Sequence, residues 1–359
     1  MIDQHPLFME LNDLQLPPEW QEAGDQIVRQ SQQTMVLGAP DSGKSTFSLW
    51  AAMECLKSGR KVAYIDSDMG QSHVGPPTTI GLEILRQDST ERERYIYFVG
   101  ATNPKQHLLQ TLTGVRMLVD RARQLAADRI IVDTTGLVHG GAARELKLQK
   151  VNLLQPDCLV AIQRGTEIEH LLGPHRDRAG AVLLRLPISE FAKVRKRDVR
   201  RSYRSERFRD YFAQAARIDL PLSQIWIQGR SYCSGKPLSS KECADVSKIL
   251  GAKMIFGNRL QEEIFLVTNA PQTDETLEKA RKHFGCNFIF HMPVGAFRNL
   301  IVGLVDESGL ARAVGLFFYL NLQEGIASIF TPLRDMQAIR MIQLGSLHVS
   351  PNGKELDWH

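Results

Sequence analysis

The stretch GAPDSGKS at residues 38–45 matches the pattern G-x-x-x-x-G-K-[ST] in full. It lies between a strand-like apolar run at residues 35–37 and a helix-like run at residues 46–57. In this pattern two glycines let backbone N–H groups turn toward phosphate oxygens, and the helix N-terminus adds the positive end of its dipole. A glycine-rich turn can match by chance, but a strand and a helix on the correct sides favour a loop that binds a nucleoside triphosphate.

Two side chains of this phosphate loop are expected to do chemistry. Lys44 is predicted to reach the β- and γ-phosphates and to act in catalysis, and Ser45 is predicted to ligate Mg²⁺. The cofactor is therefore expected to be ATP, or another nucleoside triphosphate, with Mg²⁺. The residues expected to contact the nucleotide are Gly38, Ala39, Pro40, Asp41, Ser42, Gly43, Lys44, Ser45 and Thr46.

Length and composition exclude several classes of protein. The chain has 359 residues, 43% of them hydrophobic, but no run of about 18 apolar residues that would span a membrane. Its N-terminus, MIDQHPLFMELNDLQ, has neither the basic region nor the apolar core of a secretory signal. The five cysteines are scattered and odd in number, which argues against a disulfide framework and against a paired metal site. We expect a cytoplasmic protein with reduced thiols and no membrane partner.

Alternation of apolar runs with helical patterns predicts the fold class. We expect an α/β fold of the P-loop NTPase type, in which a mainly parallel sheet is flanked by helices. A helical basic lid and a smaller β-rich C-terminal domain are expected to complete it. The strand-like runs of the sheet are residues 35–37, 62–65, 95–99, 130–132, 159–162 and 182–186.

The same pattern divides the chain into three parts. Residues 1–30 form an N-terminal arm, in which Trp20 is expected to pack onto the body of the protein. Residues 31–218 form the P-loop domain, with the basic lid at about 188–217. In residues 219–359, two apolar runs around the turn Asp-Glu-Ser-Gly predict a β-hairpin.

Acidic residues follow two of the predicted strands. In an open parallel sheet, carboxylates just past the C-terminal end of a strand face the nucleotide crevice. Asp66 and Asp68 are therefore expected to meet phosphates, Mg²⁺ or a hydroxyl proton, with an acidic turn as the alternative. Asp133 follows the run Ile-Ile-Val and is expected to hold Mg²⁺ through water, with a helix N-cap as the alternative. The predicted metal residues are thus Ser45, Asp66 and Asp133.

Four segments together resemble a known family. GAPDSGKS is followed by DSDMGQSHVGPPTTIG at 66–81, VGATNP at 99–104 and VDTTGLVHG at 132–140. This combination is similar to the polynucleotide 5′-hydroxyl kinases, which include the kinase subunit of the eukaryotic pre-mRNA cleavage factor and kinases of pre-rRNA processing. The resemblance is strong over residues 33–215 and weak beyond them. It implies transfer of the γ-phosphate of ATP to the 5′-hydroxyl of RNA, DNA or both.

The resemblance also implies roles for individual residues. Asp68, in the Asp-x-Gly-Gln element, would engage the acceptor hydroxyl. The family has a Thr-x-Gly-Trp element whose Trp stacks on a base, whereas Leu137 stands at that place here. The acceptor nucleic acid is expected to contact Gln71, Pro77, Thr78, Thr134, Gly136 and Arg197.

The segment AKVRKRDVRRSYRSERFRDYF at 192–212 is strongly basic. A solvated helix face is the alternative to a binding role, but so many cations repel one another unless anions are near, which favours phosphate contacts. The family has an Arg-x-x-Arg lid here, matched best by Arg201 and Arg204, which would neutralise the transferred phosphate, and second by Arg197 to Arg200. The cations are Lys193, Arg195, Lys196, Arg197, Arg200, Arg201, Arg204, Arg207 and Arg209.

Two further groups of residues lie near these segments. Gln163 and Arg164 follow a predicted strand and are expected to contact the adenine base or the lid, with a plain strand end as the alternative. His73, His139 and His170 lack the spacing of a transition-metal site.

Other activities remain open on the sequence alone. A regulatory GTPase would carry Asn-Lys-x-Asp after a late strand, where this chain has Ala-Ile-Gln-Arg. A P-loop NTPase switch acting in RNA processing and a small-molecule nucleoside kinase are the alternatives, and the latter shares the loop, the acids and an arginine lid. The long basic segment and the C-terminal domain favour a nucleic acid acceptor. Protein partners are not predicted.

Overall fold

The structure is a computed structural model that describes residues 11, 15–192, 194–228, 235–321 and 324–357. Its contacts divide the chain into two compact units, Met1–Arg204 and Ser205–His359. Helix α6 (Arg197–Phe212) crosses this division in sequence. The domain boundaries at residues 30 and 218 stay predictions, because contacts alone do not define parts that fold independently.

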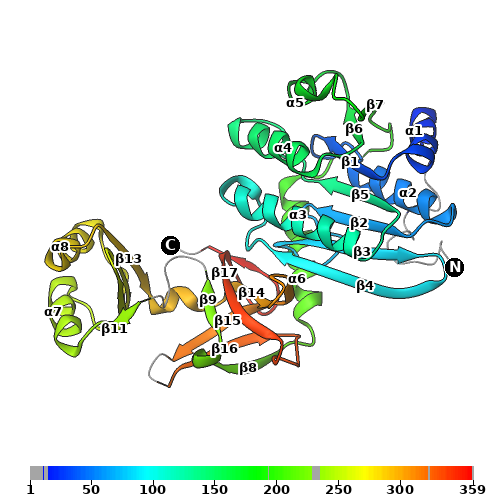
Figure 1. Cartoon of the computed structure of the whole chain (residues 1–359). Helices are drawn as coiled ribbons and strands as arrows, with labels where there is room; N and C mark the ends of the chain where they lie inside the picture. The colour runs from blue at the N-terminus through cyan, green and yellow to red at the C-terminus, as the bar shows by residue number, and fades with distance from the viewer. Residues whose placement is uncertain (1–10, 12–14, 193, 229–234, 322–323, 358–359) are drawn as a thin grey trace. The chain divides into compact units, whose positions relative to one another are not determined.

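The first unit contains a mainly parallel sheet, as predicted, in the order β4-β3-β2-β5-β1-β6-β7 (Figure 1). Strands β2, β5, β1, β6 and β7 pair in parallel, whereas β3 pairs antiparallel with both β2 and β4. Strands β1, β2, β5 and β6 are buried at every position, which is typical of parallel strands covered on both faces. The bounds are β1 Gln33–Gly38, β2 Val62–Ser67, β3 Thr79–Arg86, β4 Ser89–Phe98, β5 Arg129–Thr134, β6 Cys158–Gln163 and β7 Val182–Pro187.

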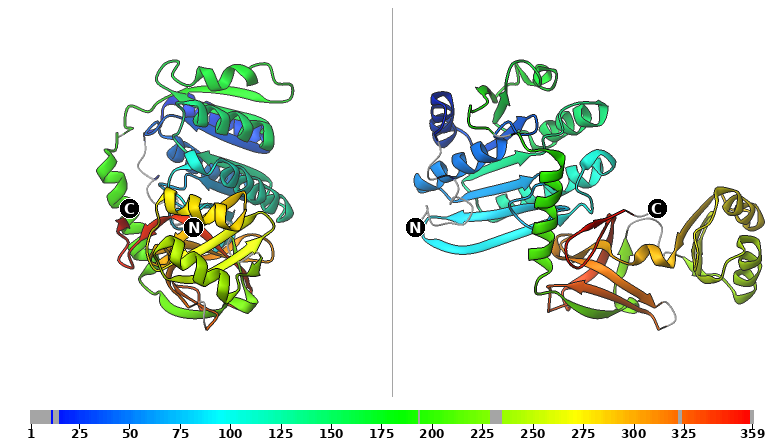
Figure 2. Two further views of the ribbon diagram at one scale, coloured as in Figure 1. Left: turned by 90° about the vertical axis from the view of Figure 1, so that its left-hand side faces the viewer. Right: turned by 180° about the vertical axis from the view of Figure 1, so that it is seen from behind.

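Helices cover both faces of this sheet (Figures 1 and 2). Helix α1 contacts α2, and α3 contacts α4. From β1 the chain crosses through α2 to β2, and from β5 it crosses through α4 to β6, in the opposite direction along the sheet. The carboxyl ends of β1 and β5 therefore flank a switch point, where open α/β sheets bind ligands. The bounds are α1 Pro18–Gln30, α2 Lys44–Lys57, α3 Leu108–Gln124, α4 Gly141–Leu154 and α5 Glu169–Leu172.

Three details of the first unit differ from or extend the sequence prediction. Strand β3 was not predicted. The basic segment becomes helical only at Arg197, where α6 begins. The packing of Trp20 is confirmed: its side chain is 1% exposed and its ring meets Phe47 edge to face, with centroids 5.3 Å apart.

The second unit is rich in strands, as predicted, and contains the predicted hairpin as β14 and β15. Val302, Phe317 and Ile329 belong to its main apolar core. Its strands, besides those of the smaller sheet, are β8 Ala216–Pro221, β9 Trp226–Gln228, β14 Leu300–Asp306, β15 Ala311–Asn321, β16 Ile326–Thr331, β17 Ile339–Val349 and β18 Glu355–Leu356.

A smaller sheet of the second unit carries two helices that the sequence analysis did not predict. Val246 and Phe284 on these helices pack with Leu266 in one apolar cluster. The elements are β10 Lys236–Pro237, α7 Ser240–Leu250, β11 Met254–Leu260, β12 Glu263–Thr268, α8 Asp274–Phe284 and β13 Phe288–Pro293. In the part of the chain that the structure describes, no helix is long and apolar enough to cross a membrane. The cysteines among those residues, Cys55, Cys158, Cys243 and Cys286, are free thiols.

Candidate active site

The phosphate loop joins the end of β1 to the start of α2. A Cβ on Gly38 would lie 2.4 Å from Ser42 Oγ and 2.7 Å from the carbonyl oxygen of Ile162, so this position has no room for a side chain. Gly43 has φ +87°, a left-handed conformation that favours glycine. Both glycines of the loop therefore stand where the backbone requires glycine, Gly38 for close packing and Gly43 for its conformation.

Lys44 lies inside the loop and is 6% exposed. Its Nζ donates a hydrogen bond to the carbonyl oxygen of Ala39 at 2.7 Å. Burial lowers the pKa of Lys44, against the opposing effect of the carboxylates of Asp133, Asp68 and Asp41. The amine thus lies near the predicted acids, on the same edge of the sheet.

Helix α1 packs against this loop through Trp20, a contact that the sequence did not predict. A Cβ on Gly43 would lie 2.9 Å from Cη2 of Trp20. The indole Nε1 of Trp20 donates a hydrogen bond to the carbonyl oxygen of Pro187 at 2.9 Å. One side chain of the N-terminal arm therefore connects the phosphate loop to the end of β7.

Asp133 stands at the end of β5 and is fully buried. Its Oδ1 accepts a hydrogen bond from the Thr134 N–H at 2.8 Å, whereas its Oδ2 is buried without a partner among the described residues. Burial raises the pKa of Asp133, against the opposing effects of the Lys44 ammonium and the neighbouring Ser45 hydroxyl. A buried, unpaired carboxylate oxygen beside the loop serine fits a residue that holds Mg²⁺.

Asp66 folds the acidic loop that follows β2. One oxygen accepts a hydrogen bond from the Asp68 N–H at 2.9 Å, and the other accepts one from the His73 N–H at 2.5 Å. Ser72 Oγ and the Val74 N–H also donate to this carboxylate, at 3.3 Å each. Burial raises the pKa of Asp66 to about 6, and His73 opposes the rise. Both carboxylate oxygens of Asp66 thus accept hydrogen bonds from the acidic loop. The metal role of Asp66 stays a prediction.

Asp68 differs from Asp66 because it is only half-buried. Its Oδ1 accepts hydrogen bonds from the Gly70 N–H at 3.0 Å and from the Gln71 N–H at 3.1 Å. These two bonds hold Oδ1 of the carboxylate in place, and the role of Asp68 toward the acceptor hydroxyl stays a prediction. A Cβ on Gly70 would lie 2.8 Å from the carbonyl oxygen of Thr102, so the acidic loop packs closely on the VGATNP segment.

The residues predicted to contact the acceptor divide into exposed and buried ones. Gln71 is half-exposed, and Pro77 is buried. Thr78 is fully buried at φ +77°, a strained conformation for a β-branched residue, and its hydroxyl has no partner among the described residues. Its backbone joins two segments, because its N–H donates to Met69 O at 2.9 Å and its carbonyl oxygen accepts from the Val99 N–H at 2.9 Å. Thr78 thus joins the acidic loop to the segment after β4, and its contact with the acceptor stays a prediction.

Thr134 and Gly136 continue β5 toward the phosphate loop. The Thr134 hydroxyl is buried and donates to the carbonyl oxygen of Val36 at 2.7 Å. A Cβ on Gly136 would lie 2.8 Å from Cα of Pro40, so this loop touches the phosphate loop closely enough to need glycine. Both acceptor roles stay predictions.

The basic segment reaches the phosphate loop through Arg200. Arg200 Nη2 donates to Asp41 Oδ2 at 2.5 Å, and the Arg195 N–H donates to the same oxygen at 3.1 Å. Arg195 Nη1 also donates to Gln71 Oε1 at 3.2 Å. This geometry favours the second lid alignment, Arg197 to Arg200. The exposed Arg197 and Arg201, the half-buried Arg204 and their proposed roles stay predictions, and Lys193 lies outside the described residues.

Gln163 ends β6 and Arg164 follows it, and both have hydrogen-bond partners within this unit. Gln163 Nε2 donates to Glu169 Oε1 at 2.7 Å, and the Arg164 N–H donates to Glu167 Oε1 at 2.8 Å. Hydrogen bonds from Arg185 help to lower the pKa of Glu169 to about 2. Contact with adenine stays a prediction for both residues.

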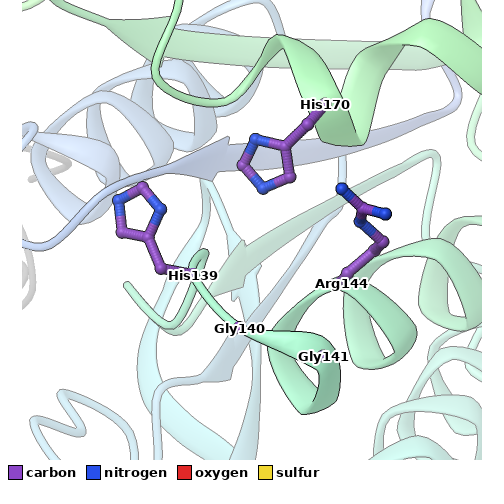
Figure 3. A pocket seen from close by; sticks show the side chains of 5 residues that line it. All are labelled: His139, Gly140, Gly141, Arg144 and His170. Carbon is purple, nitrogen blue, oxygen red and sulfur yellow. The ribbon is translucent and has the colours of Figure 1, made fainter.

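A pocket of about 300 Å³ lies where α4 begins (Figure 3). The rings of His139 and His170 are nearly parallel, with centroids 6.0 Å apart, and Arg144 lies on the same pocket. His170 Nε2 is hydrogen-bonded to the carbonyl oxygen of Val138 at 2.9 Å. Among the residues that the structure describes, no cluster of His, Cys, Asp and Glu has the form of a metal site.

The sequence analysis did not single out two buried residues beside the candidate site, Lys147 and Lys150 on α4. They are 1% and 0% exposed and contact the ends of β5 and β2. Their sequence, Glu-Leu-Lys-Leu-Gln-Lys, reads as an ordinary polar helix face, so only the fold could reveal them.

Known proteins are similar to this chain in sequence and in fold. Residues 38–214 match a family described as "mRNA cleavage and polyadenylation factor CLP1 P-loop". A polyribonucleotide 5′-hydroxyl-kinase of Thermococcus kodakarensis is 34% identical over 326 residues, covering 90% of this chain and 89% of the relative. A polyribonucleotide 5′-hydroxyl-kinase of Pyrococcus abyssi is 28% identical, covering 92% and 91%. The polyribonucleotide 5′-hydroxyl-kinase Clp1 of Bos taurus is 24% identical, covering 58% and 51%.

Among solved structures, Clp1p in a complex with Pcf11p superposes with a TM-score of 0.59. The alignment covers 92% of this chain and 78% of that one, at 13% sequence identity. At this identity the likeness concerns the fold alone.

Proposed function

Because the chain belongs to the polyribonucleotide 5′-hydroxyl kinase family, we propose that it transfers the γ-phosphate of ATP to the 5′-hydroxyl of RNA. The observation that carries the proposal is the arrangement at the ends of three neighbouring strands. The phosphate loop follows β1, Asp133 lies next to the last residue of β5, and Asp68 follows β2. Asp66 and Asp133 are register partners across β2 and β5. A nucleotide site and a candidate base thus share one edge of the sheet.

The proposed reaction assigns a task to each group. The acceptor O5′ forms a bond to the γ-phosphorus while the bond from that phosphorus to the β–γ bridging oxygen breaks, and ADP leaves. Asp68 orients the acceptor hydroxyl and takes its proton. Lys44 exchanges the Ala39 carbonyl for phosphate oxygens and neutralises their charge.

Ser45 and Asp133 would hold Mg²⁺, and the buried Oδ2 of Asp133 supports this assignment. When bound, Mg²⁺ would neutralise charge on the β- and γ-phosphates. Arg200 is well placed for a lid residue, since its guanidinium already reaches Asp41 of the phosphate loop. It would exchange that carboxylate for a phosphate of the nucleotide.

The test is transfer of label from γ-labelled ATP to a panel of acceptors. We expect label on oligoribonucleotides with a 5′-hydroxyl, weaker labelling of matched DNA, and none on free nucleosides. Preferential labelling of nucleosides would favour the nucleoside kinase instead. ATP hydrolysis without transfer to any acceptor would favour the NTPase switch.

A further inference from the structure

Two lysines of α4 lie in the interior of the first unit. Lys147 and Lys150 are among the largest fully buried side chains of the described residues. Lysine is almost never fully buried unless its charge is paired. Here the amine of Lys147 is bonded to hydroxyl and carbonyl oxygens and that of Lys150 to a hydroxyl, instead of to carboxylates.

Lys147 connects α4 to the ends of β5 and β1. Its Nζ donates hydrogen bonds to Thr134 Oγ1 at 2.8 Å and to the carbonyl oxygen of Thr135 at 2.6 Å. The Thr134 hydroxyl in turn donates a hydrogen bond to the carbonyl oxygen of Val36 in β1. Two residues beyond Val36 the phosphate loop begins, and directly after Thr135 comes Gly136, which packs on Pro40.

Lys150 connects α4 to the ends of β2 and β5. Its Nζ donates to Ser67 Oγ at 3.0 Å, and Ser67 Oγ donates to the carbonyl oxygen of Asp133 at 2.6 Å. Ser67 directly precedes Asp68 in the sequence. The chain of hydrogen bonds therefore joins the backbone of the proposed metal residue to the strand that carries the proposed base.

Stability does not explain these lysines. Burial lowers the pKa of Lys147 well below its usual range and that of Lys150 to about 8, so the interior penalises both charges. Apolar side chains of similar volume are often as stabilising as buried charged groups, or more so. A lysine amine, however, brings three donors on a long stem, which can join polar strand ends that an apolar side chain cannot.

We propose that Lys147 and Lys150 are positioning residues that hold the ends of β1, β2 and β5 in one arrangement, and thereby set Asp68 and Asp133 relative to the phosphate loop. The proposal rests on the proposed kinase activity. The lysines act through Ser67, Thr134 and Thr135 and touch neither ATP nor the acceptor. A misplacement of about 1 Å at a reacting group can lower a rate by roughly 10²-fold, so small shifts of these strand ends matter.

The test replaces each lysine by methionine in the full chain. For Lys147→Met and Lys150→Met we expect kcat to fall by about 10- to 100-fold. We expect KM for ATP to stay within about threefold and the thermal midpoint to stay level or rise. Gln149→Met is the matched control, because Gln149 is exposed on the same helix and receives the same new side chain. Its kcat should equal that of the wild type.

A double-mutant cycle tests the Lys150 connection directly. Ser67→Ala removes the bridging hydroxyl, so it should lower kcat as Lys150→Met does, and the double variant should be no worse than the poorer single one. Losses that multiply would show that Lys150 does not act through Ser67. Ser67→Ala also keeps the proposal testable if a methionine variant fails to fold.

Amide hydrogen exchange separates this proposal from the proposed function. In Lys147→Met and Lys150→Met, amide exchange should become faster in residues 66–72 and 134–137. In the control Gln149→Met, amide exchange in these residues should equal that of the wild type. This readout needs no activity, so a wild type that phosphorylates no acceptor would overturn the proposed function alone. Wild-type kcat and wild-type exchange in both lysine variants would overturn the positioning role.

Discussion

Arg200 of α6 donates a hydrogen bond from Nη2 to Oδ2 of Asp41 in the phosphate loop, at 2.5 Å across 159 positions of sequence. The Arg200 side chain is 29% exposed and that of Asp41 is 11% exposed. The start of the basic segment is therefore held at the loop that we propose binds phosphate. Because the pair is partly exposed, its contribution to stability is small, at most about 1 kcal/mol.

We predict that Arg200→Ala lowers kcat by at least about 10²-fold with little change in thermal midpoint, since an arginine that stabilises the transferred phosphate is worth roughly 10³- to 10⁵-fold in related NTPases. Steady-state kinetics with RNA measures this. Arg209→Ala, on the same helix but exposed, is the control and should leave kcat unchanged. Normal kcat in Arg200→Ala, with a large loss of kcat in Arg201→Ala or Arg204→Ala, would show that Arg201 and Arg204 form the lid pair instead.

Asp68 and Asp133 should lose different functions when each becomes asparagine. Asp68→Asn should lose most turnover yet bind ATP with Mg²⁺ normally, because its role is to take the acceptor proton. Asp133→Asn should bind the nucleotide more weakly and need more Mg²⁺ for half-maximal activity. Nucleotide titrations at several Mg²⁺ concentrations separate the two. Asp128→Asn, at the opposite end of β5, is the control. Weaker nucleotide binding and a higher Mg²⁺ requirement in Asp68→Asn, but not in Asp133→Asn, would exchange the two roles.

The buried amine of Lys150 predicts a pH dependence of stability. Its pKa falls from 10.5 in the unfolded chain to about 8 in the folded protein. Between these values the unfolded state binds more protons, so the contribution of Lys150 to the free energy of unfolding rises with pH, by up to about 3 kcal/mol. Denaturant titrations of the wild type and Lys150→Met, at pH 7 and pH 9.5, measure the difference. A difference that is the same at both pH values would contradict the lowered pKa of this buried amine.

Cations at the start of the basic segment should bind the nucleic acid strand. Arg195→Ala with Lys196→Ala should raise KM for oligoribonucleotide and reduce the slope of log affinity against log salt by about 0.7 for each phosphate that is no longer neutralised. Affinity measured at several salt concentrations gives this slope. The control neutralises Lys279 and Lys282 on α8, which are also exposed. Equal effects of both pairs would indicate a solvated helix face.

Within the first unit, the sequence predicted the strands that contain an uninterrupted apolar run and missed β3, whose apolar residues are interrupted by Glu83. Strands β1, β2, β5 and β6 each contain a short apolar run, and runs of this kind can be read directly from the sequence. Strand β3 contains Glu83, whose charge argues against burial. In the fold that carboxylate is fully buried, and it forms ion pairs with Arg92 at 2.7 Å and Arg94 at 2.9 Å on β4.

The sequence offers candidate site residues where a motif or an acid coincides with a strand end, as for Lys44 and Asp133, and their roles stay predictions. It does not predict which distant residues supply the partners. Lys150 bonds to Ser67, 83 positions away, and Arg200 to Asp41, 159 positions away. No local pattern encodes such pairs, because each depends on how the strands are ordered in the sheet.

The most direct measurement compares two oligoribonucleotides that differ only at the 5′ end, one with a hydroxyl and one with a phosphate. Each is incubated with γ-labelled ATP and Mg²⁺, and with either the wild type or Lys44→Ala. The account predicts label on the 5′-hydroxyl RNA alone, and none with Lys44→Ala, which should remain folded. Label on both RNAs, no label on either, or transfer by Lys44→Ala at the wild-type rate would contradict it.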